Sequence, residues 1–117
     1  MRRDVLKLLE DVRVAATSIQ DYTQGLTAAG YLAAKPIRRA VEREFEIIGE
    51  ALRRPAEAHA DIGARVPQAG QIIGFRNILA HGYDAVVDER VWNTVAADIP
   101  VLLAAVRALI EEERQLP

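Results

Sequence analysis

The chain of 117 residues has no cysteine, only two histidines and few aromatic residues. Without cysteine it can form no disulfide, no cysteine-ligated zinc site and no cysteine nucleophile. Because His59 and His81 are the only imidazoles, a histidine-rich metal site within one chain is not expected. No closely spaced pair of aspartates suggests a magnesium site. The residues are therefore compatible with chemistry that needs no metal.

Long apolar runs are absent as well. No stretch of about 18 uncharged apolar residues exists, so no membrane span is expected. The beginning, MRRDVLKLLEDV, is interrupted by Lys7, Glu10 and Asp11, unlike the apolar core of a signal peptide. We therefore expect a cytoplasmic protein. The net charge of −2 argues against a protein that coats duplex DNA, but it leaves room for a nuclease with a local basic cleft.

The chain is instead rich in aliphatic residues. Half of its residues are hydrophobic, mostly Ala, Leu, Val and Ile, which favours packed helices over a β-sandwich. Its length suits one domain with a single modest core. No repeat, low-complexity tract or linker suggests a second domain. We therefore expect a single domain over residues 1–117.

Apolar residues recur every three or four positions in several segments, which is the spacing of amphipathic helices. The expected helices are Asp4–Gly25, Pro36–Pro55, Pro67–Gly82 and a last one that begins with Asp88 as its N-cap. Residues 55–66 are typical of a short helical turn and a loop. Pro100 is expected to kink or divide the last helix, and the tail EEERQLP to fray. The predicted fold is all-α, an antiparallel bundle of about four main helices plus a short helical turn.

The stretch RNILAHGYD, residues 76–84, holds one of the two histidines behind an Arg-Asn pair. A purely structural interpretation makes Arg76 and Asn77 an exposed helical pair, His81 a favourable group at a helix C-terminus, and Tyr83 a lid on the core. A chemical interpretation assigns phosphate binding to Arg76, whose guanidinium is a planar fork of donors. His81 would then take a proton from a ribose 2′-hydroxyl or give one to the leaving 5′-oxygen.

The spacing of this pair favours a symmetric assembly. Five residues at about 100° each leave Arg76 and His81 roughly 140° apart around one helix, so one helix face does not unite them. The long arginine side chain could close part of that gap. A two-fold dimer would place two copies of each residue around a shared cleft. We therefore expect a homodimer that cleaves RNA without metal and leaves a 2′,3′-cyclic phosphate.

RNILAHGY matches the Arg-x4-His-x-Tyr motif of the HEPN ribonuclease superfamily. The stretches RRDVLKLLEDVRVAATSIQDYTQGL, AVEREFEIIGEAL, IIGFRNILAHGYD and VWNTVAADIPVL resemble, in order, the blocks of the HepT toxin family. This resemblance covers nearly the whole chain. It implies an HEPN-like helical toxin of a type VII-like toxin–antitoxin system. Such a toxin dimerises through its motif helix and cleaves RNA such as tRNA or mRNA.

The resemblance also implies a role for each motif residue. Arg76 and His81 would be catalytic, with Asn77 supporting them. Tyr83 would receive AMP from ATP through an MntA-like minimal nucleotidyltransferase, which acts as antitoxin, while cleavage itself would need no cofactor. AMP on Tyr83 adds bulk and negative charge beside the cleft, and both oppose access of an RNA phosphate. From the residues alone, Tyr83 could equally be a packed aromatic side chain with its hydroxyl at the surface.

The charged residues of the second helix allow two interpretations. Glu42, Glu46 and Glu50 share a helix face and favour a solvated surface or partners for nearby arginines, with Glu50 and Arg54 well spaced for an ion pair. Glu50 could instead orient Arg76 from the neighbouring helix. Arg38, Arg39 and Arg43 could extend a phosphate-binding surface or only keep the protein soluble. The GQIIG stretch, residues 70–74, is expected to allow close helix packing.

Two other functions fit the same residues. The chain could be a non-catalytic helical subunit that binds a minimal nucleotidyltransferase or serves as its substrate. It could also be a plain helical adaptor in which Arg76 and His81 are structural.

Overall fold

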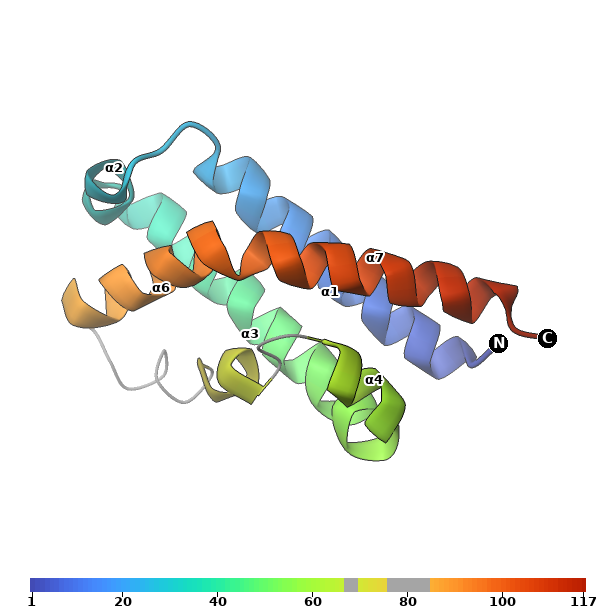
Figure 1. The fold of residues 1–117 in the computed structure, drawn as a ribbon. Helices are drawn as coiled ribbons and strands as arrows, with labels where there is room; N and C mark the ends of the chain where they lie inside the picture. Colours follow the sequence, from blue (N-terminus) through green and yellow to red (C-terminus); the bar gives the residue numbers. More distant parts are fainter. Residues whose placement is uncertain (67–69, 76–84) are drawn as a thin grey trace.

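Two long helices, α1 (Arg3–Thr23) and α3 (Lys35–Ala58), pack antiparallel along their length and form the frame of the molecule (Figure 1). A third long helix, α7 (Ile99–Gln115), lies along α1. The computed structural model describes residues 1–66, 70–75 and 85–117. These residues contain helices and no strand, as the aliphatic composition predicts.

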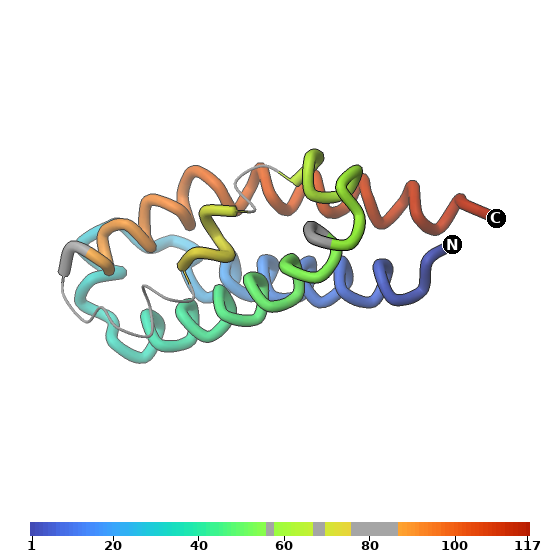
Figure 2. Tube along the Cα trace, turned by 90° about the horizontal axis from the view of Figure 1, so that it is seen from below, coloured from blue at the N-terminus to red at the C-terminus, as the bar shows by residue number. Residues whose placement is uncertain are grey.

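Shorter helices connect this frame. α2 (Ala28–Ala33) packs against α3 and α6 (Ala85–Ala97), α4 (Ala60–Arg65) folds back on α3, and residues 70–75 form one more helical segment. The tube in Figure 2 shows that the N-terminal end of α1 and the C-terminal end of α7 lie side by side. The all-α bundle predicted from periodicity is therefore confirmed.

The core follows the apolar stripes of the sequence. On α1 the buried positions are Val5, Leu9, Val12, Ala15, Ala16 and Ile19, at steps of three and four. α1 ends at Thr23, and Gly25 adopts a φ of 78°, the left-handed conformation that glycine favours at a helix end. Asp4 lies in the first turn of α1 and not at its N-cap, which is Arg2.

The helical segment 70–75 is held against α3 by an aromatic contact. Phe75 is 1% exposed and meets Phe45 edge to face, with ring centroids 5.5 Å apart and an interplanar angle of 83°. This confirms a helix in the middle of the predicted third segment. The start expected at Pro67 and the stop expected at Gly82 lie outside the described residues.

The last segment divides at Pro100, as predicted. α6 ends at Ala97, α7 begins at Ile99 with Pro100 in its first turn, and the axes of the two helices differ by 49°. The predicted N-cap is wrong, because α6 already begins at Ala85 and Asp88 lies within its first turn.

Pro55 does not end its helix, contrary to prediction. α3 continues to Ala58, and the His59 amide donates to the Pro55 carbonyl across 2.8 Å. Proline removes one hydrogen bond of the helix, but Ala51, Leu52 and Pro55 are all buried. Burial of this face offsets the lost bond.

α2 is a helix that periodicity missed, because six residues are too few to show a period. Thr27 caps it by accepting a hydrogen bond from the Gly30 amide at 3.1 Å. Its Tyr31 is fully buried against Trp92 of α6, with ring centroids 5.2 Å apart. This contact attaches the connection between α1 and α3 to α6.

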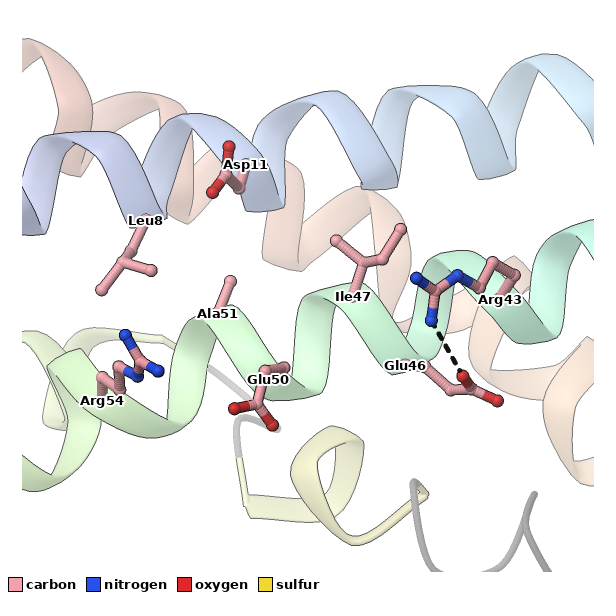
Figure 3. A pocket seen from close by; sticks show the side chains of 8 residues that line it. All are labelled: Leu8, Asp11, Arg43, Glu46, Ile47, Glu50, Ala51 and Arg54. Atoms are coloured by element: carbon pink, nitrogen blue, oxygen red, sulfur yellow. Dashed lines mark hydrogen bonds and ion pairs between the residues drawn. The ribbon is translucent and has the colours of Figure 1, made fainter.

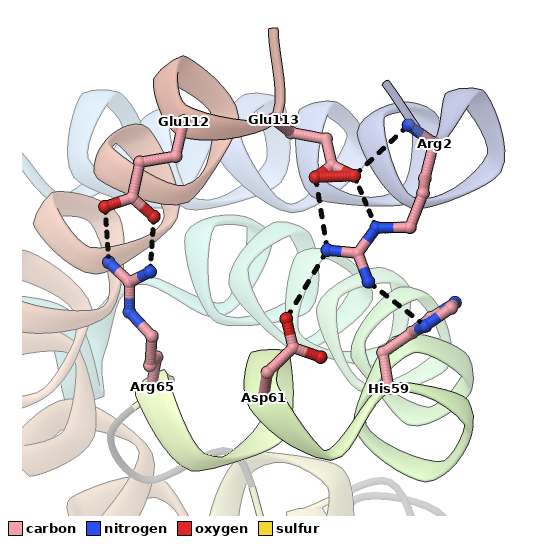
Figure 4. A network of polar contacts seen from close by, with 6 residues as sticks. All are labelled: Arg2, His59, Asp61, Arg65, Glu112 and Glu113. Atoms are coloured by element: carbon pink, nitrogen blue, oxygen red, sulfur yellow. Dashed lines mark hydrogen bonds and ion pairs between the residues drawn. The ribbon is translucent and has the colours of Figure 1, made fainter. Parts of the chain in front are cut away.

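The C-terminal segment is not frayed, which corrects the expectation from its polar sequence. α7 runs to Gln115, and the Glu113 side chain is buried and accepts a hydrogen bond from Arg2 Nε at 2.5 Å (Figure 4). Arg2 also donates to His59 Nδ1 at 3.2 Å and pairs with Asp61 at 3.5 Å. The surrounding ion pairs form what we call the terminal network: Arg2, His59, Asp61, Arg65, Glu112 and Glu113.

Within the described residues, no single helix is long and apolar enough to cross a membrane. The bent pair of Val87–Ala97 and Ile99–Gln115 reaches that length and composition only when its two helices are taken together.

Candidate active site

The four motif residues predicted to act on RNA, Arg76, Asn77, His81 and Tyr83, lie outside the described residues. The elements on either side of them are described. Phe75, which directly precedes Arg76 in the chain, is buried against α3. The chain resumes as helix α6 at Ala85. In the chain, the motif therefore follows a residue of the core and precedes the start of α6.

Gly49 of α3 brings the chain that leads into the motif close to this helix. A methyl group at Gly49 would lie 3.5 Å from the Ile72 carbonyl oxygen and 3.5 Å from the Ile73 Cα atom. The two backbones therefore meet with no room for a larger side chain. The GQIIG stretch therefore packs closely on a helix, as predicted, but the glycine at the contact is Gly49, since within the described residues a methyl group at Gly70 or Gly74 would meet nothing within 4 Å.

Glu50, the predicted support for Arg76, directly follows Gly49. Its carboxylate is 42% exposed and pairs with Arg53 at 3.6 Å. Figure 3 shows the Glu50 carboxylate on the side of α3 that points away from α1. Its place beside the contact of Gly49 with Ile72 and Ile73 agrees with a supporting role, and that role stays a prediction.

The arginines at the start of α3 are already paired. Arg38 forms an ion pair with Asp88 of α6 at 3.4 Å and donates to the Leu32 carbonyl. Two further pairs run along the helix, Arg39 with Glu42 at 3.0 Å and Arg43 with Glu46 at 3.2 Å. The prediction that these glutamates are partners of nearby arginines is confirmed. The same pairs reduce the charge that Arg38, Arg39 and Arg43 could offer to phosphate.

The hollow between α1 and α3 does not suit RNA either. It has a volume of about 290 Å³ and an apolar floor of Leu8, Ile47 and Ala51 (Figure 3). The charged residues around it are Asp11, Arg43, Glu46, Glu50 and Arg54, three carboxylates against two guanidinium groups. An excess of negative charge disfavours the binding of a phosphodiester.

Sequence reasoning missed a second hollow, which lies between residues 70–75 and α6. We call it the α6 groove: its polar side chains are Gln71, Arg90, Asn93 and Asp98, and the buried residues of its lining are Phe75 and Thr94. The spacing of residues 90, 93 and 94 places them on neighbouring turns of α6, with Asp98 just beyond its end, and could have indicated a polar stripe. The partner segment, 70–75, could not be inferred from that spacing.

The described residues hold no group of three or more His, Cys, Asp or Glu side chains that could bind a metal ion. The described carboxyl groups with shifted pKa values lie on α3 and α7. Burial raises the pKa of Glu44, while the hydrogen bond from Arg2 lowers the pKa of Glu113.

The fold and the motif together define a class of proteins. The described chain is an all-helical bundle, and its Arg-x4-His stretch stands in the sequence between a core-packed helical turn and the next helix, as in HEPN proteins. Residues 12–109 match the family described as "Ribonuclease HepT-like", and the chain belongs to this family.

Several relatives are similar over most of their length. A Methanocaldococcus jannaschii protein whose name assigns it to the RNases is 33% identical over 85% of this chain and 90% of its own. The "Probable ribonuclease HepT" of Thermococcus cleftensis is 31% identical over 87% of this chain and 92% of its own. No solved structure matches the chain significantly. Family membership and these names support the expected endoribonuclease activity.

Proposed function

We propose that this chain is the toxin of a type VII-like toxin–antitoxin system and that it cleaves RNA with Arg76 and His81, without a metal cofactor. The observation that carries the proposal is the intact RNILAHGY sequence inside the 12–109 family match. A scaffold does not need the set of Arg76, Asn77 and His81, whereas together they supply phosphate binding and proton transfer.

The chemistry is an internal transfer at phosphorus. His81 takes the proton of a ribose 2′-hydroxyl, and the 2′-oxygen attacks the adjacent phosphorus. The bond to the 5′-oxygen of the next nucleotide breaks, and that oxygen takes a proton from the protonated imidazole of a His81 and leaves as a hydroxyl. Arg76, with Asn77 beside it in sequence, stabilises the negative charge that accumulates on the non-bridging oxygens. The products are a 2′,3′-cyclic phosphate and a 5′-hydroxyl.

A homodimer belongs to this proposal, because two copies of the motif segment supply Arg76 and His81 to one cleft. Glu50 supports Arg76 from α3. The antitoxin is an MntA-like nucleotidyltransferase, which transfers AMP from ATP to the Tyr83 phenol oxygen and releases pyrophosphate. The added phosphate and adenosine block the cleft. The system acts in the cytoplasm on RNA such as tRNA or mRNA.

Cleavage is tested with purified protein, labelled tRNA and mRNA, and excess EDTA. We expect the wild-type protein to produce cyclic-phosphate ends and His81→Ala to reduce the rate by at least about 100-fold, the size of a lost acid–base contribution. Circular dichroism should show unchanged helicity for His81→Ala. The proposal fails if wild-type protein leaves both RNAs intact and wild type and variant are equally harmless in cells.

Regulation is tested by incubating the chain with an MntA-like nucleotidyltransferase and ATP. Mass spectrometry should find one AMP on Tyr83, and Tyr83→Phe should accept none. If Tyr83 is modified while the unmodified protein never cleaves RNA, the chain is the non-catalytic partner of the nucleotidyltransferase. If His81→Ala lowers stability and no activity exists to lose, it is a plain adaptor.

A further inference from the structure

The α6 groove has a volume of about 290 Å³, and none of the roles proposed above uses it. One wall is the helical segment 70–75 and the other is α6, which ends beside Asp98. Its place in the chain is informative, because Phe75 of its lining directly precedes Arg76. α6, which carries Arg90 and Asn93, begins directly after the motif stretch. Both walls therefore continue into the proposed active site.

The polar side chains of this groove have unused hydrogen-bonding capacity. In the described part of the chain, Gln71, Asn93 and Arg90 make no side-chain hydrogen bond or ion pair. Arg90 differs in this respect from the arginines of α3, of which Arg38, Arg39 and Arg43 each have a carboxylate partner. Its guanidinium is open to an external anion.

Asp98 is also available. It occupies the N-cap position of α7, where an aspartate usually accepts a hydrogen bond from the first turn, yet its side chain makes no such bond. Pro100, the second residue of α7, has no amide hydrogen to offer. The carboxylate is only partly exposed and lines the groove.

The chemistry of these groups fits one nucleotide. A free carboxylate accepts two parallel N–H bonds, and guanine is the RNA base that presents two adjacent donors, N1–H and N2–H, on its Watson–Crick edge. Gln71 and Asn93 can each donate to and accept from a base. Arg90 precedes Asp98 by eight residues, about 12 Å at the rise of a helix, and can hold a phosphate while Asp98 binds the base.

We propose that the α6 groove is a specificity subsite that binds a guanosine of the RNA beside the cleaved bond. Asp98 accepts the guanine N1–H and N2–H, and Arg90 binds a phosphate of the same strand. The inference rests on the proposed function, since it assumes that RNA reaches the motif.

Binding to the non-cleaving His81→Ala protein tests the subsite without relying on activity. The probes are fluorescent hexauridylates that carry one central guanosine, inosine or adenosine, and inosine lacks the 2-amino group. We expect guanosine to bind about tenfold more tightly than inosine, the effect of losing one charge-assisted hydrogen bond. Adding Asp98→Asn should reduce this ratio to about one. Asp98→Ser, which retains a good N-cap residue, provides a second variant.

Two matched controls isolate the groove. Glu89→Gln removes the same charge from α6 outside the groove and should leave the guanosine-to-inosine ratio unchanged. Arg90→Gln should weaken all three probes equally and reduce the salt dependence of binding by about one phosphate contact. Arg107→Gln, on α7, should change neither the affinity for the probes nor the salt dependence of binding.

Equal affinities for the guanosine and inosine probes, no measurable binding of any probe, or a ratio unaffected by Asp98→Asn and Asp98→Ser overturns the subsite. Cleavage by wild-type protein decides the proposed function separately. If RNA is cleaved but guanosine is not preferred, the function stands and the subsite falls. If guanosine is preferred through Asp98 but wild-type protein never cleaves, the subsite stands and the ribonuclease mechanism falls.

Discussion

Charged side chains are paired in the terminal network, whereas those of the α6 groove are not. In the terminal network every charged side chain has an opposite partner: Arg2 with Glu113 and Asp61, and Arg65 with Glu112. In the α6 groove, Arg90 and Asp98 have no partner within the described chain and do not pair with each other. Paired charges hold helix ends together, whereas unpaired ones in a hollow remain available to a ligand. The contrast separates a structural end of the bundle from a candidate binding end.

The largest change in stability among the predicted variants is expected where α3 meets the segment that leads into the motif. Gly49→Leu forces side-chain atoms into the backbone at Ile72 and Ile73, and we expect a loss of about 2–3 kcal/mol in unfolding free energy. Urea denaturation followed by circular dichroism measures it. Gly49→Ala should cost much less, and Gly74→Leu, where a methyl group meets no described atom within 4 Å, should be tolerated. Equal losses for Gly49→Leu and Gly74→Leu would contradict the close approach.

The terminal network is tested next by Glu113→Gln, which sets an amide NH2 against the guanidinium donors of Arg2. We expect a loss of about 2 kcal/mol at pH 7. The adjacent Glu112→Gln is the matched control, because the pair of Glu112 with Arg65 is about half exposed and contributes little. If both variants lose the same unfolding free energy, the burial of Glu113 does not make its ion pair more stabilising than the exposed pair of Glu112.

The same carboxylate predicts a pH dependence with a definite sign. The hydrogen bond from Arg2 lowers the pKa of Glu113 below its ordinary value of 4.5, so the folded state binds this proton less tightly than the unfolded chain does. Its contribution is therefore complete above 4.5 and disappears as the pH falls through the lower folded-state pKa. Acid titration of unfolding free energy should show a shallower decline for Glu113→Gln than for wild type.

A smaller effect of opposite sign is expected at Tyr31. Its hydroxyl is buried without a hydrogen-bond partner in the described structure, and burial raises the pKa of the phenol. Tyr31→Phe removes the unsatisfied group and keeps the ring contact with Trp92. We expect a gain of about 1 kcal/mol in unfolding free energy. A loss would show that the hydroxyl has a partner in solution.

The smallest effect on stability is expected in the α6 groove itself. Because Arg90 and Asp98 have no partner to lose, Arg90→Gln and Asp98→Asn should each change the unfolding free energy by less than about 0.5 kcal/mol. Thermal unfolding compares them with Glu113→Gln. Destabilisation similar to that of Glu113→Gln would mean that the groove residues are structural.

The parts of this fold that could be predicted are those that depend on near neighbours in sequence. The stripe of α1, the stop at Gly25 and the break at Pro100 follow from spacing and backbone chemistry. Glu113 could not be predicted as buried, because its partner Arg2 is 111 residues away. The prediction that Pro55 ends α3 failed for a similar reason, since burial against other helices outweighs the hydrogen bond that proline removes.

The same division holds for the site. RNILAHGYD is a local pattern, so its proposed chemistry and family could be read from the sequence. The α6 groove is not local, because it needs residues 70–75 to lie against α6. Close packing of residues 70–74 could likewise be predicted, but not that Gly49 is the glycine at the contact, since a sequence shows which glycines are spaced for packing but not which one meets a neighbour.

The meeting of the two chain ends has a consequence for engineering. The Met1 ammonium lies 2.5 Å from a Pro117 carbonyl oxygen, while the turn after α1 lies at the far end of the bundle (Figure 1). A short glycine linker would join the ends without moving any helix. New chain ends could then be opened between α1 and α2. The new termini of this circular permutant would lie at the end of the bundle opposite the terminal network.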